Sequence, residues 1–113
     1  MYLNQWTLIG RLTADPELSY TPTGKAVAKC RIAINMGQDR TEFHSIVLWD
    51  KTAEFVGTYG AKGRLMLVEG RAQTRQWESD GQKRQATECV GHNARFLDAA
   101  KKKEEKEGDG DEA

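Results

Sequence analysis

The feature that most constrains the fold of this chain is the alternation of apolar and polar residues between positions 25 and 35. Every second position holds a small or branched apolar residue: Ala26, Ala28, Cys30, Ile32 and Ile34. Successive side chains of a strand point to opposite faces, so these residues share one face, and Lys25, Lys29 and Arg31 share the other. The pattern predicts a β-strand with one buried face and one basic face.

A second alternating segment covers residues 41–49. Ile46 and Leu48 point one way, whereas Phe43 and Trp49 point the other way. Two aromatic rings therefore lie outside the predicted core. They form either a second hydrophobic layer, as in a sandwich, or an exposed surface on which bases can stack.

The segment from residue 64 to residue 77 predicts a longer strand with an unusual polar face. Arg71, Gln73, Arg75 and Trp77 share that face, and Gly70 marks a bend or bulge. Guanidinium groups bind phosphate oxygens, and an exposed indole stacks on any base with about 1–3 kcal/mol per base. The face therefore fits single-stranded nucleic acid. The alternative is a solvated edge strand with one partly buried Trp.

The remaining segments supply two further strands, the turns and a helix. Residues 3–12 predict a first strand in which Trp6 lies in the core or at a subunit interface, and residues 14–17 break regular structure. Residues 21–24 and 79–81 predict turns, and residues 83–97 a last strand. Residues 50–63 favour a short helix with Asp50 as its cap.

These elements are five strands with one short helix between the third and the fourth. This order predicts an all-β fold, the five-stranded Greek-key barrel known as the OB-fold. The length of 113 residues and the apolar content of 38% suit one compact domain, which we place at residues 1–98, followed by a charged, disordered tail at residues 99–113.

Charge and reactive residues narrow the class of function. Residues 1–97 carry 13 Lys and Arg against 10 Asp and Glu, whereas residues 98–113 carry 4 against 7. A mildly basic body is compatible with nucleic acid but does not require it. Cys30 and Cys89 lack metal-ligand spacing, and no catalytic set is recognisable, so we expect no metal, no cofactor and no enzyme activity. Without a signal segment, the chain is expected to be soluble and intracellular.

Several motifs in order make residues 2–97 resemble the bacterial single-stranded DNA-binding proteins. They are Gly-Arg-Leu-Thr-Ala-Asp-Pro-Glu-Leu at 10–18, the segment 20–28, Thr-Glu-Phe-His at 41–44, the segment 63–77 and Asp-Gly-Gln-Lys-Arg at 80–84. The resemblance implies an OB-fold homotetramer in the bacterial cytoplasm, associated with the nucleoid. Such a protein wraps single-stranded DNA without sequence preference in replication, recombination and repair.

The resemblance also assigns roles to individual residues. Phe43, Trp49 and Trp77 match the family's base-stacking aromatics, and His44 matches a histidine near subunit contacts. The expected phosphate ligands include three matched positions, Arg75, Lys51 and Lys62. The others follow from the face assignments alone: Arg11, Arg31, Arg71 and Arg84.

Two segments depart from the family pattern. The connection at 36–40 is short where many relatives carry a longer basic loop with a further aromatic, which predicts fewer nucleotides per subunit or weaker binding. The acidic tail lacks the Pro-Phe end with which relatives recruit repair and replication enzymes, so recruitment is not expected. The shorter loop and the missing tip fit an alternative, an OB-fold adaptor of the primosome type with weak nucleic-acid binding. An RNA-binding protein is a third possibility, because stacking alone does not distinguish RNA from DNA.

Overall fold

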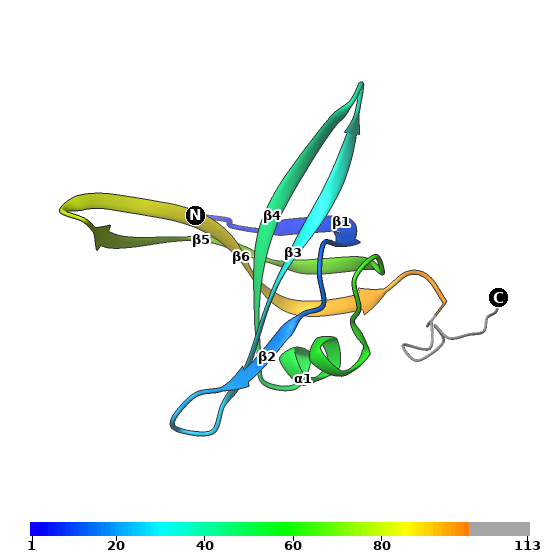
Figure 1. The fold of residues 1–113 in the computed structure, drawn as a ribbon, viewed down its shortest axis with the longest axis horizontal. Coiled ribbons are helices and arrows are strands. Elements are labelled where there is room, and N and C mark those ends of the chain that lie inside the picture. Colours follow the sequence, from blue (N-terminus) through cyan, green and yellow to red (C-terminus); the bar gives the residue numbers. More distant parts are fainter. Residues whose placement is uncertain (100–113) are drawn as a thin grey trace.

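The computed structural model describes residues 1–99, which form six strands and one helix (Figure 1). The elements in chain order are β1 (Trp6–Leu12), β2 (Glu17–Tyr20), β3 (Ala26–Gly37), β4 (Arg40–Trp49), α1 (Asp50–Tyr59), β5 (Leu65–Ser79) and β6 (Gln82–Phe96). The predicted tail from residue 100 onward lies outside the described residues, so the division into domain and tail stays a prediction.

Five of the strands pair in a closed order. The sequence of neighbours is β1-β5-β6-β4-β3, and β1 pairs again with β3 through Arg11 opposite Ala33 and Leu12 opposite Ile32. The pairing of β4 with β6 is parallel, and the other pairings are antiparallel. This is the strand order of an OB-fold, and α1 follows the third strand of the ring, so the predicted fold class is confirmed.

The short strand β2 was not predicted. It pairs with β3 outside the ring, with Leu18 opposite Ala28. Leu18 packs against the core and also against α1, where a Cβ added at Gly57 would lie 2.8 Å from the Cβ of Leu18. The glycine that weakens the helix locally therefore lets β2 approach it closely.

The core contains the apolar faces that the alternation predicts. Its largest fully buried side chains are Leu12, Ile32, Ile46, Leu48, Val56, Met66, Val68 and Cys89. Ala53 and Val56 supply the buried side of α1, whereas Tyr59 in its last turn is exposed. The predicted Asp50 cap is wrong: Trp49 occupies the N-cap position in extended conformation, and no side chain caps the helix.

Two hairpins extend beyond the ring. We call residues 33–43 of β3 and β4 the β3–β4 arm, and residues 71–90 of β5 and β6 the β5–β6 arm; the first points up in Figure 1 and the second points left. Asp80 and Gly81 form the tip of the β5–β6 arm with φ values of 53° and 76°. Both positive values suit the two-residue turn that the sequence predicts there.

A register shift marks the base of the β5–β6 arm. Glu69 lies opposite Asn93, but Gly70 lies opposite Gly91, so His92 is the extra residue in the ladder. The predicted irregularity at Gly70 is confirmed. Beyond the shift, the arm keeps a constant register up to its tip.

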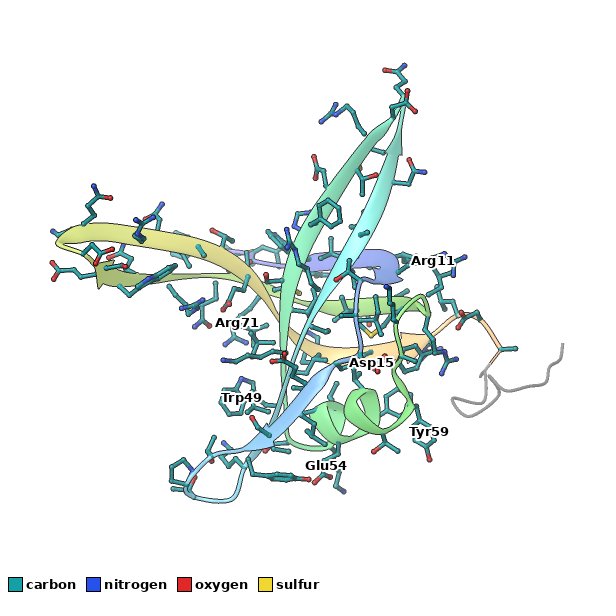
Figure 2. The ribbon with its side chains drawn as sticks, in the orientation of Figure 1. Arg11, Asp15, Trp49, Glu54, Tyr59 and Arg71 are labelled. Carbon is teal, nitrogen blue, oxygen red and sulfur yellow. The ribbon has the colours of Figure 1, made fainter. Side chains whose placement is uncertain are left out.

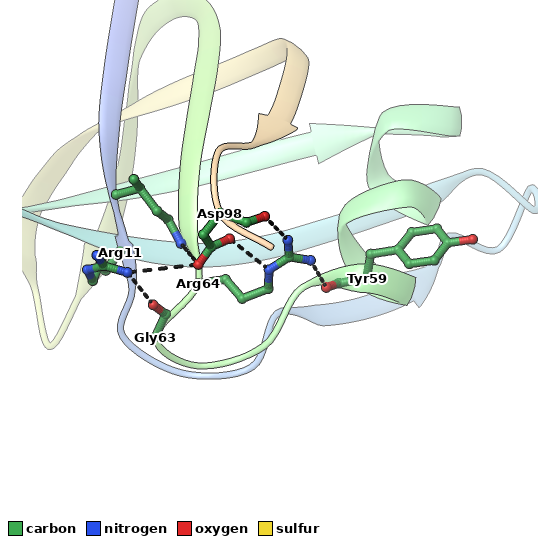
Figure 3. Close-up of polar contacts among 6 residues, drawn as sticks. Arg11, Tyr59, Gly63, Arg64 and Asp98 are labelled. Atoms are coloured by element: carbon green, nitrogen blue, oxygen red, sulfur yellow. Dashed lines mark hydrogen bonds and ion pairs between the residues drawn. The ribbon is translucent and has the colours of Figure 1, made fainter. Parts of the chain in front are cut away.

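A buried arginine closes the fold where β5 begins (Figure 3). The side chain of Arg64 is only 7% exposed, and its Nε lies 3.1 Å from Oδ1 of Asp98. Its Nη1 and Nη2 donate to the backbone oxygens of Tyr59 and Asp98, and its Cζ lies 4.1 Å from the centre of the Phe96 ring. Arg64 thus ties the end of α1 to the segment that follows β6.

Asp98 is held in its ionised form by this closure. Burial by itself raises the pKa of Asp98, but hydrogen bonds from the Leu65 backbone N–H and from Arg64, together with the charge of Arg64, hold that pKa below its ordinary value. The carboxylate is therefore part of the folded structure at neutral pH.

Within residues 1–99, no helix has the length and apolarity needed to cross a membrane.

Candidate nucleic-acid interface

The polar face predicted for β5 lies on the outside of the ring and the β5–β6 arm. Arg71, Gln73, Arg75 and Trp77 are all exposed. Their partners on β6 are, in the same order, Val90, Glu88, Ala86 and Arg84. This outer face is therefore a two-stranded surface that carries three arginines, one indole and one carboxylate.

The three predicted stacking aromatics remain exposed. Phe43 is 50% exposed, Trp49 39% and Trp77 40%. In the described part of the chain they form no second hydrophobic layer of a sandwich. Each ring therefore has a face or an edge available to a ligand.

A cation lies over each of these rings. The Cζ of Arg31 is 4.9 Å from the Phe43 ring centre, and the Cζ of Arg75 is 4.8 Å from that of Trp77. The Nζ of Lys25 is 5.9 Å from the Trp49 ring centre. Aromatic and cationic side chains thus alternate on the strands, as the sequence predicts, in an arrangement that suits bases attached to phosphates.

A groove of about 900 Å³ lies where the base of the β5–β6 arm meets the start of β3 and the end of β4. Its lining comes from β3, β4, β5 and β6 and includes Trp49, Lys29, Arg71 and Arg75. Figure 2 shows Trp49 and Arg71 on the same side of the molecule. A second hollow, of about 510 Å³, lies farther along the β5–β6 arm between Trp77 and Arg84.

Three of the predicted phosphate ligands lie elsewhere. Arg11 donates to the backbone oxygen of Gly63 at 3.0 Å, beside the Arg64 closure and at the other end of the ring from the groove (Figures 2 and 3). Lys51, on the first turn of α1, and Lys62, before β5, are exposed but do not line the groove. Their contact with phosphate stays a prediction.

His44 is half buried on β4. Its ring meets the Trp6 ring edge-on with centres 5.6 Å apart, and its Nε2 lies 3.4 Å from Oε1 of Glu42. Trp6 itself packs partly against the core. The predicted place of His44 at a subunit interface stays a prediction.

Several residues at the groove or over the rings were not among the predicted site residues, and the charged or titratable ones are Lys25, Lys29, Asp50, Glu88 and His92. The alternation already placed both lysines on the basic face. The Asp80-Gly81 turn also sets the register of the arm, from which Glu88 opposite Gln73 follows by counting. The place of His92 depends on the register shift: Gly70 signals an irregularity, but not that the extra residue lies on β6.

Glu88 forms an ion pair inside the groove. Its Oε2 lies 3.2 Å from Nε of Arg75, and its side chain is 13% exposed whereas that of Arg75 is 52% exposed. The carboxylate therefore belongs to the wall of the groove, and the guanidinium faces the solvent. Arg75 contacts the carboxylate and the Trp77 ring at the same time.

The two cysteines belong to the core rather than to the groove. Cys89 is fully buried, and Cys30 packs against the core cluster. Burial raises the pKa of Cys30 to about 12 and also raises the pKa of Cys89. Both are free thiols that stay protonated at neutral pH.

The fold and the groove together define an oligonucleotide-binding module of the OB class. Residues 3–97 match the Single-strand binding protein family, and the chain belongs to that family.

Curated relatives carry the corresponding names. The chain is 46% identical to Single-stranded DNA-binding protein 3 of Clostridium acetobutylicum, over 85% of this chain and 72% of the relative. It is 42% identical to Single-stranded DNA-binding protein 3 of Listeria innocua, over 86% of this chain and 65% of the relative. It is 42% identical to the Single-stranded DNA-binding protein of Bacillus cereus, over 85% of this chain and 61% of the relative. The match thus spans 61% to 72% of the length of these relatives.

Proposed function

We propose that this protein binds single-stranded DNA without sequence preference and protects it during replication, recombination and repair. Membership in the Single-strand binding protein family supports the binding of single strands. The observation that carries the mechanism is the set of three exposed rings, each with a cation over it.

In this mechanism, bases stack on Phe43, Trp49 and Trp77 while cations hold the backbone. Stacking requires a π-face, which every base has, so it does not select a sequence. Lys29 and Arg71 line the groove. Arg31 lies next to the base of the β3–β4 arm, over Phe43, and Arg84 lies on the β5–β6 arm, so both extend the positive surface beyond the groove. Salt should weaken binding because each cation on a phosphate displaces a counterion.

The finer properties of the proposal come from the family resemblance. They are a homotetramer, a non-enzymatic role and a place in the bacterial cytoplasm on the nucleoid. We assign His44 and Trp6, which are half buried and in edge contact, to the interface of this assembly. Light scattering, combined with a poly-dT titration, measures the assembly state and the nucleotides bound per subunit.

The decisive experiment is a fluorescence titration with poly-dT. Binding should quench Trp fluorescence, and Trp49→Ala and Trp77→Ala should each weaken affinity by about 1–3 kcal/mol. Tyr59→Ala is the matched control, because Tyr59 is an exposed aromatic on α1 outside the groove and should leave affinity unchanged. Wild-type affinity in both Trp variants would remove the stacking assignment.

The adaptor alternative is not favoured. An adaptor does not need three exposed rings with cations over them, and the relatives described above are named for binding single-stranded DNA. Gel shifts on single- and double-stranded oligonucleotides test this directly. Competition between matched DNA and RNA strands tests the preference for DNA.

A further inference from the structure

The groove lining holds two carboxylates that a phosphate-binding surface does not require, Asp50 and Glu88, and of these Glu88 forms an ion pair with a cation of the site. Glu88 lines the groove beside Arg71, Gln73 and Arg75. Its side chain is 13% exposed, so its charge is poorly screened by solvent. A phosphate that enters the groove meets this negative charge as well as the cations.

Glu88 also distinguishes one cation–ring pair from the other two. Arg75 over Trp77 has the carboxylate of Glu88 at 3.2 Å. In the part of the chain that the structure describes, no ion pair is found for Arg31 over Phe43 or for Lys25 over Trp49. The ring on the β5–β6 arm is therefore covered by an arginine that is already partly neutralised.

We propose that Glu88 is an affinity-limiting residue, which competes with the DNA phosphate for Arg75. This inference rests on the proposed binding of single-stranded DNA. Arg75 is half exposed and can turn toward a phosphate, whereas Glu88 is fixed in the groove wall. Binding on this arm therefore exchanges or shares an existing ion pair, which weakens the hold on the strand and reduces the number of counterions released.

The geometry favours competition over support. A residue that positions Arg75 for phosphate should leave the guanidinium facing the groove with its charge available. Here the carboxylate of Glu88 pairs with Nε of Arg75. The Cζ of Arg75 lies 4.8 Å from the centre of the Trp77 ring, which is the surface that a base needs for stacking. A base that stacks on this side of Trp77 displaces Arg75 from the ring. Glu88 and the phosphate then compete for the displaced guanidinium.

The test is Glu88→Gln, which keeps the shape of the side chain and removes its charge. Poly-dT affinity at low salt should rise roughly threefold to tenfold. The slope of log affinity against log salt should become steeper, by at most about one unit, because Arg75 then starts unneutralised. Glu54→Gln is the matched control: it removes the same charge from α1, outside the groove, and should change both quantities much less.

A double variant isolates the pair. In an Arg75→Gln background, Glu88→Gln should lose most of its effect if competition for Arg75 is the mechanism. Glu88→Ala removes the same charge without adding an amide. It replaces Glu88→Gln in the binding test if the Gln variant unfolds at a lower temperature than wild type. It should also bind more tightly than wild type.

Two results would overturn the proposal. Weaker binding by Glu88→Gln with an unchanged salt slope would mean that Glu88 supports Arg75, and an effect that persists without Arg75 would mean that the pair is irrelevant. Failure of the proposed function is a separate result, because the wild-type protein would then show no salt-dependent binding of poly-dT.

Discussion

Two arginines of this protein make nearly the same contacts and differ in exposure. Arg64 has Nε at 3.1 Å from Asp98 and Cζ at 4.1 Å from the Phe96 ring centre. Arg75 has Nε at 3.2 Å from a carboxylate and Cζ at 4.8 Å from the Trp77 ring centre. The side chain of Arg64 is 7% exposed and that of Arg75 is 52% exposed.

The comparison shows that contact chemistry alone does not assign a role to an arginine. At Arg64 the cation is enclosed and the carboxylate is 25% exposed, so the pair closes the fold. At Arg75 the carboxylate is enclosed and the cation faces solvent, so a ligand can compete for it. We therefore expect the first pair to affect stability and the second to affect binding.

The largest expected effect is that of Arg64→Ala on stability. Removal of a buried cation leaves Asp98 and two backbone carbonyls without their partner, so the free energy of unfolding should fall by about 3 kcal/mol or more. Arg75→Ala is the matched control and should cost less, about 1–2 kcal/mol, since the guanidinium is half exposed although the enclosed Glu88 loses its cation. Urea unfolding followed by circular dichroism measures both. Equal losses of unfolding free energy in the two variants would contradict the different roles that we assign to Arg64 and Arg75.

A smaller effect is expected for Asp98→Asn, with a defined pH dependence. Loss of charged hydrogen bonds should lower the free energy of unfolding by about 1–3 kcal/mol at neutral pH. Because the folded-state pKa of Asp98 lies below its ordinary value, its contribution is complete above that ordinary value and is lost as the pH falls through the lower folded value. The difference in stability between wild type and variant should therefore begin to shrink below about pH 4 and vanish only below the folded-state pKa. A constant difference down to pH 2 would contradict this assignment.

The smallest effect concerns the salt dependence of DNA binding. Arg71 lines the groove and has only a weak 3.4 Å contact with Gln73, so Arg71→Ala should lower the salt slope by about one unit. Arg75→Ala should lower it by less than that, because Glu88 already neutralises part of its charge. Poly-dT titrations at several salt concentrations give both slopes. A larger change at Arg75 than at Arg71 would reverse the order that the comparison predicts.

Much of the fold could be predicted because its strands carry local patterns. The alternation around Ile32 and Ile46 reports directly which face is buried, and the Asp80-Gly81 turn reports where a hairpin reverses. Strand β2 has no such pattern: it depends on pairing with β3 and on the contact of Leu18 with Gly57, which are tertiary. The predicted cap at Asp50 failed because Trp49 continues directly from β4 into the helix.

The sequence predicts which face of its strand a site residue lies on. It does not predict where around the ring of strands that residue lies, or whether it reaches the groove. Alternation places Arg11 and Arg71 equally on outer faces, yet only Arg71 reaches the groove. Whether an arginine is free or paired also depends on distant residues, as Glu88 and Asp98 show. Alternation placed Phe43 and Trp49 opposite the apolar face of their strand but left open whether a second hydrophobic layer covers them, and only the tertiary structure shows them exposed.

The divergence of the two arms has a consequence for the shape of any bound polymer. A strand that reaches both Phe43 on one arm and Trp77 on the other must change direction, because the two arms diverge (Figure 1). A duplex has a persistence length of about 50 nm and resists such a bend, whereas an unpaired strand follows it readily. Mechanical stiffness, and not only the availability of unpaired bases, should thus keep double-stranded DNA off this surface.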